Sequence, residues 1–290
     1  MITNSVYEIV TKRIVEELEK GVIPWQKPWF DKKINYVTRK PYRGVNLLLL
    51  PKPGEYLTWN QIQKIGGKVK KGAKSYIVTF CKKYFLVNGS FVEPTDEFID
   101  DVYEESYEER FVLRYYRVFH IDDVEGIPSK IPHKEETNES EKLEKARKVA
   151  AEYIKREKIS FIETQYNTRS YYNISADEIV LPMKRFFVSE SYYYQVLFHE
   201  MTHSTGHPKR LHRFEDDKKA AAFGTKEYSK EELIAELGSA YLMSFVGLTP
   251  TYRNSAAYIQ SWLSVLKNDK RFIISAAAKA EKAVRYILEK

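Results

Sequence analysis

Five consecutive residues, His199-Glu200-Met201-Thr202-His203, have the types and spacing of a catalytic metal site. On a helix, positions i and i+4 share one face, so both imidazoles can reach one metal ion. Glu200 would then lie beside the metal, placed to take a proton from a bound water. On an ordinary surface helix the pattern would be two solvated histidines. Here apolar residues 196–198 precede the motif and Gly206 follows it, so we predict one Zn²⁺ per chain, with another divalent metal as a possible occupant.

A tetrahedral catalytic zinc needs a third protein ligand and one open position. No histidine follows at metzincin spacing, so we expect a glutamate from a later helix, and Glu232 is favoured. Glu236 lies four residues on, on the same face, and could hydrogen-bond a ligand histidine or be the third ligand itself. This arrangement resembles thermolysin-like enzymes. Ser229 and Glu232 also have the spacing of a helix capping box, which is the structural alternative for Glu232.

A catalytic site of this kind implies hydrolysis. Zinc would polarise a carbonyl and lower the pKa of its water, while Glu200 would act as general base and then protonate the leaving amine. An oxyanion donor is also expected, and Tyr228, His207 and Arg210 are the candidates. The competing interpretation is a structural zinc, but such sites usually have four protein ligands and are rich in cysteine, whereas Cys81 is the only cysteine in the chain.

A second group of residues combines aromatic rings with positive charge and lies in the first 74 residues. Single-stranded nucleic acid is bound by a positive groove with aromatic faces on which bases stack. The alternative is that the tryptophans are core residues and the lysines a solvated turn. The predicted DNA-binding residues are Trp25, Trp29, Arg39, Lys40, Tyr42, Arg43, Asn46, Trp59, Lys68, Lys70, Lys71 and Lys74.

The charge of the chain is unevenly distributed. Its 290 residues include 47 basic and 40 acidic side chains, a net charge of +7. Residues 1–92 hold 17 basic and 6 acidic side chains, whereas residues 93–128 hold 3 and 12. The acidic segment 93–110 is predicted to be a solvated insertion or a long hairpin tip. The basic excess that would suit a nucleic acid therefore lies before residue 93.

The expected elements describe an α+β protein with two domains. Apolar residues at helical spacing predict helices over 2–20, 58–65, 141–158, 191–204, 229–246, 256–267 and 272–288. Alternating or β-branched runs predict strands over 75–87 and 110–121, with short strands at 160–163 and 171–174. We predict an N-terminal α+β domain over 1–128, a linker over 129–140, and a mostly helical domain with a small sheet over 141–290. No run reaches the ~18 apolar residues of a membrane span and no secretory signal is visible, so a cytoplasmic protein with no membrane partner is expected.

Ordered short motifs along nearly the whole chain resemble the ArdC-type antirestriction proteins, which are related to the N-terminal part of TraC-type plasmid primases. They are Pro24-Trp25-x-x-Pro28-Trp29, Tyr42-Arg43-Gly44-Val45-Asn46, Trp59-Asn60-Gln61, the Gly66-to-Gly72 run, Tyr116-Arg117-Val118-Phe119, His199 to His207, Arg210-Leu211-x-Arg213, Phe223-Gly224, Glu231 to Gly238, and Ser261 to Asp269. The acidic segment 93–110 departs from this resemblance and would compete with DNA if it lay near residues 68–74.

The resemblance implies an N-terminal single-stranded-DNA-binding domain and a C-terminal zincin-like metallopeptidase domain. It also implies that the protein protects incoming mobile DNA from restriction. The expected partners are single-stranded DNA and a protein substrate or restriction enzyme. Two alternatives stay open: a zinc protease whose basic domain recruits acidic protein substrates, and a non-catalytic DNA-binding module with a structural metal.

Overall fold

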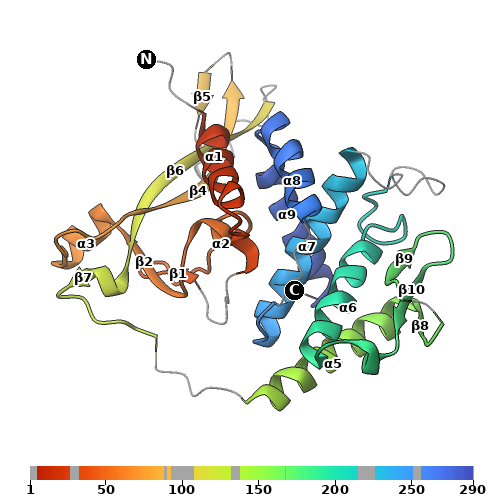
Figure 1. Cartoon of the computed structure of the whole chain (residues 1–290). Coiled ribbons are helices and arrows are strands. Elements are labelled where there is room, and N and C mark those ends of the chain that lie inside the picture. Colours follow the sequence, from red (N-terminus) through yellow and green to blue (C-terminus); the bar gives the residue numbers. More distant parts are fainter. Residues whose placement is uncertain are drawn as a thin grey trace.

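The computed structural model describes residues 5–26, 33–87, 90–92, 108–131, 138–166, 168–214, 226–250 and 256–289. Its N-terminal half is built on a five-stranded sheet and its C-terminal half on helices, with a smaller sheet at the far side (Figure 1). This confirms the predicted α+β class and the mostly helical second half. Trp29 and residues 93–107 of the acidic segment lie outside the described residues.

The large sheet has the strand order β1-β2-β6-β4-β5. Its bounds are Lys33–Asn35 for β1, Gly54–Thr58 for β2, Glu108–His120 for β6, Tyr76–Val87 for β4 and Ser90–Val92 for β5. The two long strands are those that the sequence predicted, and they pair antiparallel from Tyr76 opposite Val118 to Leu86 opposite Glu108. The β1–β2 pair is parallel and was not predicted, because its strands are too short to show an alternating pattern.

The helix α3 (Trp59–Ile65) confirms the predicted 58–65 segment. Thr58 accepts the backbone N–H of Gln61, and the Gln61 side chain accepts the backbone N–H of Thr58, so this is a capping box. Gly66 ends the helix with a φ of 87°, a left-handed conformation that suits glycine. A two-stranded ladder of β3 (Lys68–Val69) and β7 (Val124–Glu125) closes this end of the sheet.

The C-terminal half holds the five helices predicted after residue 140, each within a few residues of its expected bounds. They are α5 (Glu139–Glu157), α6 (Glu190–Ser204), α7 (Lys226–Val246), α8 (Ala256–Asn268) and α9 (Phe272–Ile287). The small sheet has the order β8-β10-β9, with bounds Ser160–Thr164, Glu178–Pro182 and Tyr171–Asn173. Its central strand β10 was missed, because the short apolar run from Ile179 to Leu181 has no periodicity that distinguishes a strand from a helix segment.

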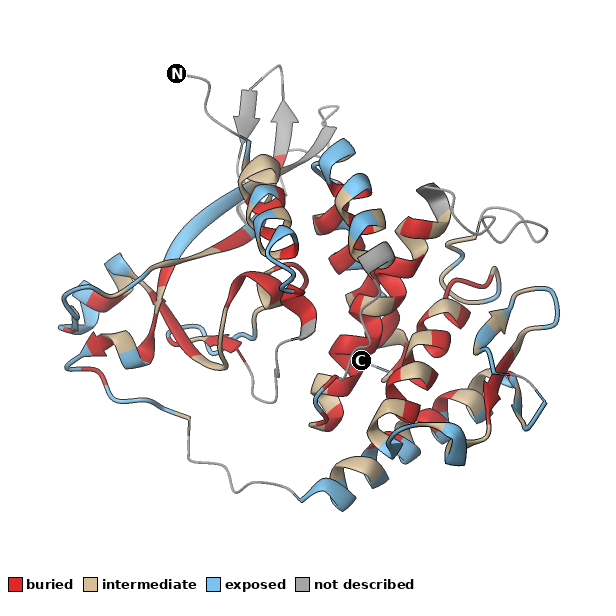
Figure 2. Ribbon diagram, in the orientation of Figure 1, coloured by how far each residue is buried: buried red, intermediate tan, exposed pale blue. Residues whose placement is uncertain are grey.

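The main hydrophobic core extends from the C-terminal helices to the first residues of the chain. The helix α1 (Val6–Glu19) and the turn η1 (Pro24–Gln26) pack with α7 and α8, and the Trp25 and Trp262 rings meet edge to face with centroids 5.2 Å apart. The short helix α2 (Asn46–Leu49) joins the same core, and Tyr241 of α7 donates to the Gly44 carbonyl oxygen. Figure 2 shows the buried residues concentrated where these helices face one another. The predicted division at residues 129–140 stays a prediction, and this core lies on both sides of it.

Within the described segments, no helix combines the length and the apolar character that crossing a membrane requires.

Candidate metal centre and nucleic-acid interface

The helix α6 presents the two histidines toward α7. It begins after Ser189, whose side chain accepts the Tyr192 backbone N–H, and its other faces bury Leu197, Phe198 and Met201 in the core. The helix ends at Ser204, and at Gly206, two residues further on, an added Cβ would lie 2.5 Å from the Phe214 ring. The apolar packing around the motif fixes the direction of its polar face, as the sequence predicted.

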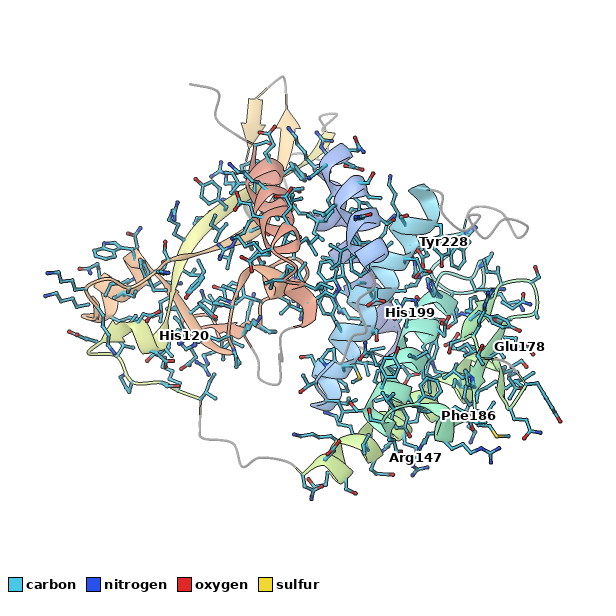
Figure 3. All side chains as sticks on the ribbon, in the orientation of Figure 1. His120, Arg147, Glu178, Phe186, His199 and Tyr228 are labelled. Carbon is cyan, nitrogen blue, oxygen red and sulfur yellow. The ribbon has the colours of Figure 1, made fainter. Side chains whose placement is uncertain are left out.

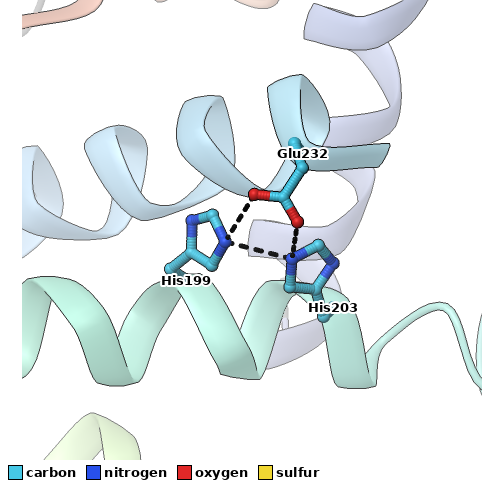
Figure 4. A group of neighbouring side chains, drawn as sticks. All are labelled: His199, His203 and Glu232. Atoms are coloured by element: carbon cyan, nitrogen blue, oxygen red, sulfur yellow. Dashed lines mark hydrogen bonds and ion pairs between the residues drawn. The ribbon is translucent and has the colours of Figure 1, made fainter. Parts of the chain in front are cut away.

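His199, His203 and Glu232 meet at one point between α6 and α7 (Figure 4). The two Nε2 atoms lie 3.0 Å apart, and the Glu232 carboxylate oxygens lie 3.5 Å from His199 Nε2 and 3.3 Å from His203 Nε2. Ligand atoms at 2.0–2.1 Å from a tetrahedral zinc would be roughly 3.3 Å apart. The three side chains therefore fit a tetrahedral divalent metal with a fourth position left open.

Two further carboxylates of α7 lie on the outer nitrogens of the histidines. Glu236 Oε1 is 3.5 Å from His199 Nδ1, and Glu231 Oε1 is 3.4 Å from His203 Nδ1. Glu236 thus lies where a residue that orients a ligand would lie, on the far side of the ring from Glu232. Glu231 was missed, although its place directly before Glu232 in an acidic run was a usable signal.

The electrostatics of the site follow from burial and from these contacts. Burial raises the pKa of Glu200, whose carboxylate also accepts the backbone N–H of Tyr172. Burial disfavours the charged form of His203, but its contacts with Glu231 and Glu232 prevail and raise its pKa to about 10. Burial would also raise the pKa of Glu232, yet the two histidines lower it well below its usual range. Without a metal, protons on the histidines thus balance the charge of Glu232.

Arg210 is not available as an oxyanion donor. Its side chain is almost fully buried and donates to Asp177 at 3.1 Å, to the Ser204 carbonyl oxygen at 2.7 Å and to the Tyr172 hydroxyl at 2.9 Å. This arginine instead ties the end of α6 to the small sheet. Tyr228 and His207 stay predictions for the oxyanion role.

Three residues predicted to bind DNA make contacts inside the protein, and of these only Trp25 is fully buried. Trp25 is 0% exposed in the core, so the prediction that it stacks on bases is wrong. Asn46 accepts the Thr79 N–H at 2.6 Å and donates to the Thr79 carbonyl oxygen at 2.9 Å, which satisfies the edge of β4. Tyr42 is half-buried against the Tyr56 ring. The predicted DNA-binding roles of Asn46 and Tyr42 stay predictions.

The remaining predicted DNA-binding residues that the structure describes are exposed, and they stay predictions. Trp59 is 51% exposed at the start of α3, and Arg43 lies 3.7 Å from Glu281 of α9. Arg39 pairs with the buried Glu55, and Lys70 donates to the Asp122 carbonyl oxygen. The other exposed cations are Lys40, Lys68, Lys71 and Lys74.

Sequence reasoning missed an exposed aromatic and basic surface on β4 and β6. Phe80 lies directly opposite Arg114 and Val78 lies opposite Tyr116, so Phe80, Lys82, Arg114 and Tyr116 share one face of the pair. Phe80 is 57% exposed and Tyr116 45%, and the exposed middle of β6 is visible in Figure 2. We call these four residues the β4–β6 face. Alternating aromatic and basic residues within the predicted strands were the available signal.

Two family models match the chain in order. Residues 4–119 match the N-terminal domain of anti-restriction factor ArdC, and residues 148–279 match a zincin-like metallopeptidase. Fold and site thus define a two-domain protein with a zincin-like second domain, as predicted.

Solved structures and curated relatives identify the family. The metal-free and Mn(II)-bound crystal structures of the antirestriction ArdC protein from the R388 plasmid are 30% and 31% identical to this chain. Each has a TM-score of 0.73 and covers 99% of this chain, which in turn covers 97% and 98% of theirs. The chain belongs to the ArdC-type antirestriction family.

Two longer relatives and one uncharacterized relative are similar to nearly the whole of this chain. Two DNA primases TraC of Escherichia coli are 32% and 31% identical over 97% of this chain, which spans only 20% and 27% of their length. The uncharacterized protein y4eC of Sinorhizobium fredii (strain NBRC 101917 / NGR234) is 30% identical, and the match covers 96% of this chain and 89% of that protein. The resemblance to plasmid primases stated from the motifs is therefore confirmed.

Proposed function

We propose that this protein protects DNA of mobile genetic elements from restriction by binding it as a single strand, and that its helical domain holds one zinc ion. Family membership supports the antirestriction role. The meeting of His199, His203 and Glu232 at tetrahedral spacing carries the metal proposal. The Mn(II)-bound structure of the ArdC protein from the R388 plasmid supports binding of a divalent ion by this fold.

The β4–β6 face supports binding of a single strand rather than a duplex. Its two exposed rings, Phe80 and Tyr116, can each stack on an unpaired base, and Arg114 and Lys82 lie beside them to contact phosphates. In a duplex the faces of the bases are covered by their neighbours, so these rings would have no equivalent partner. The exposed Lys68, Lys71 and Lys74 add positive charge in the same domain.

Titration of a fluorescent single-stranded oligonucleotide, by anisotropy, tests this part. Phe80→Ala and Tyr116→Ala should each weaken binding by roughly 5- to 150-fold, since a stacked base contributes about 1–3 kcal/mol. Phe186→Ala is the matched control, because that ring is equally exposed but lies on the turn η4 (Lys184–Phe186) in the helical half (Figure 3). Equal affinity for the single strand and its duplex would contradict stacking, as would a double variant that binds like the control.

The metal site supports a hydrolytic function for the helical domain. A bound zinc would supply Lewis-acid polarisation of a carbonyl and a lowered pKa for water. Glu200 lies beside the ligands on the same helix, is buried, and is held by the Tyr172 N–H. Its carboxylate is thus placed to accept a proton from the attacking water and later to donate it to the leaving amine. A protein substrate, including a restriction enzyme, suits this chemistry.

Glu200→Gln separates a peptidase from a site that only stabilises the fold. This variant should keep its metal, because Glu200 is not among the three ligand side chains, and should lose cleavage of protein substrates. Metal content by atomic emission and cleavage of candidate restriction enzymes measure the two effects. The metal is structural if Glu200→Gln protects DNA as well as the wild type, while His199→Ala binds no metal and has a lower melting temperature.

A further inference from the structure

Arg213 lies next to the proposed metal site and contacts both α6 and α7. It follows α6 by nine residues, in the segment that returns along the end of that helix. Its side chain is 8% exposed. A buried guanidinium needs hydrogen-bond acceptors for its N–H groups. The acceptors of Arg213 therefore show which parts of the structure this side chain holds in place.

Arg213 holds the Glu231 carboxylate through both of its oxygens. Nη2 donates to Glu231 Oε1 at 2.7 Å and Nε donates to Oε2 at 3.3 Å. This two-point contact fixes the plane of the carboxylate, which a single donor would not do. Glu231 Oε1 then faces His203 Nδ1 at 3.4 Å.

The same guanidinium also holds the end of α6. Nη1 donates to Thr205 Oγ1 at 2.7 Å and Nη2 donates to the Thr202 carbonyl oxygen at 2.8 Å. These acceptors flank His203 on the chain. One side chain therefore fixes both the backbone that carries His203 and the carboxylate that its ring faces.

We propose that Arg213 is a positioning residue for the metal site, acting through Glu231 on His203; this rests on the proposed metal site. With Glu231 held as an acceptor, the His203 proton is kept on Nδ1 and the Nε2 lone pair is directed at the ion. The His199 side of the site differs, since within the described residues Glu236 has no arginine or lysine within ion-pair distance. The two histidines are thus positioned unequally, and His203 is the more firmly fixed.

Arg210 provides the matched control. Arg210 lies in the same segment after α6 and makes a comparably buried ion pair with Asp177. It also donates to the Ser204 carbonyl oxygen at the end of α6. Within the described part of the chain its acceptors are Asp177, the Ser204 carbonyl oxygen and the Tyr172 hydroxyl, none of which is a proposed ligand or a carboxylate that faces one. Losing either arginine removes a buried ion pair, but of the two only Arg213 holds a carboxylate that faces a proposed ligand.

The experiment compares the zinc affinity of the metal-stripped full-length chain with Arg213→Met, Arg213→Lys and Arg210→Met, by competition with a chromophoric chelator. We expect Arg213→Met to weaken zinc binding by about 10- to 100-fold relative to Arg210→Met. Arg213→Lys should recover part of this loss, because a lysine keeps the charge but not the two-point contact. Equal affinities for Arg213→Met and Arg210→Met would overturn the proposal.

A second variant covers the case in which Arg213→Met does not fold. Glu231→Gln keeps the shape of the side chain and should weaken zinc binding to a similar extent, and wild-type affinity in this variant would overturn the proposal. The absorption spectrum of the Co²⁺-loaded protein gives an independent readout, since a displaced His203 should change its d–d bands. If the wild type binds no metal, the proposed metal site itself is wrong. If the wild type binds zinc and Arg213→Met binds it equally well, only the role of Arg213 is wrong.

Discussion

Gly238 of α7 lies directly against Thr202 of α6, so that a methyl group at residue 238 would be 2.4 Å from Thr202 Cγ2. The two helices therefore approach at a point where only a glycine fits without displacement. Gly238 lies two residues after Glu236, and Thr202 lies beside His203. The close approach thus brings the α7 carboxylates within reach of the α6 histidines.

Gly238→Ala should move the two helices apart. We expect the free energy of unfolding of the metal-free protein to fall by roughly 1–3 kcal/mol, the usual cost of an overpacked core, and zinc binding to weaken because Glu232 is displaced. Urea unfolding and chelator competition measure the two effects. In the double variant with Thr202→Ala the two nearest opposing atoms, Cγ2 and Oγ1, are gone, so part of both losses should be restored; strictly additive effects would contradict the contact.

Glu232 and Glu236 should differ in their importance for metal binding. Glu232 lies between the two Nε2 atoms, so Glu232→Ala should reduce zinc affinity by more than the roughly 10- to 100-fold typical of a residue that only orients a ligand. Glu236 contacts the outer nitrogen of His199, so Glu236→Gln should fall within that range. Isothermal titration with Zn²⁺ compares them, and the opposite ranking would make Glu236 the third ligand.

Local patterns in the sequence were sufficient for part of this site. The spacing of His199 and His203 on a helix, and Glu232 on a later one, depends on periodicity within single helices, which the sequence shows directly. Glu231 and Arg213 were missed as contributors because their role arises only when α6 and α7 pack together. Trp25 was misjudged for the same reason: its ring is covered by Trp262, a residue more than two hundred positions away. Strand β10 lacked a diagnostic pattern, because it is apolar at every position from Ile179 to Leu181.

Glu55 should make the stability of the sheet depend on pH. Burial alone would raise its pKa, but hydrogen bonds from Arg39, Ser129 and the Lys130 backbone N–H prevail and lower it below the usual value. A lowered pKa in the folded state means that Glu55 stabilises the fold above its unfolded-state value of about 4.5, and that this contribution is lost as the pH falls through the folded-state value.

Glu55→Gln should therefore reduce the free energy of unfolding at pH 7 by roughly 1–3 kcal/mol, and by much less at pH 3. Urea unfolding of both proteins at each pH gives the comparison. Glu144→Gln is a suitable control, since Glu144 is exposed on α5 and pairs with Arg147 of the same helix. A difference between wild type and Glu55→Gln that does not change with pH would show that the charge of Glu55 contributes nothing.

Trp25 and Trp59 should contribute to different properties of the protein, Trp25 to stability and Trp59 to DNA binding. Trp25→Ala would leave a cavity in the shared core and should destabilise the protein by about 3–5 kcal/mol. Trp59→Ala removes a half-exposed ring that rests on Phe119 at a centroid distance of 6.2 Å, so the loss should be well below that. Thermal unfolding measures both. Measured where both variants are folded, single-strand affinity should be unchanged in Trp25→Ala, and a large loss there would return Trp25 to the DNA interface.

Arg114 should contribute to DNA binding through charge. It is exposed on β6 opposite Phe80, and its guanidinium lies 5.5 Å from the centroid of the Tyr84 ring, which directs it over the β4–β6 face. Each phosphate neutralised by the protein releases counterions and contributes about 0.7 to the slope of log affinity against log salt for a single strand. Arg114→Gln should lower that slope by about this amount, whatever the base sequence.

The control is Lys148→Gln on α5, an exposed cation in the other half, which should leave the slope unchanged. Anisotropy titrations over a range of NaCl concentrations give the slopes. If Arg114→Gln and Lys148→Gln have equal slopes, Arg114 does not contact a phosphate, and Lys68, Lys71 and Lys74 are the next residues to test.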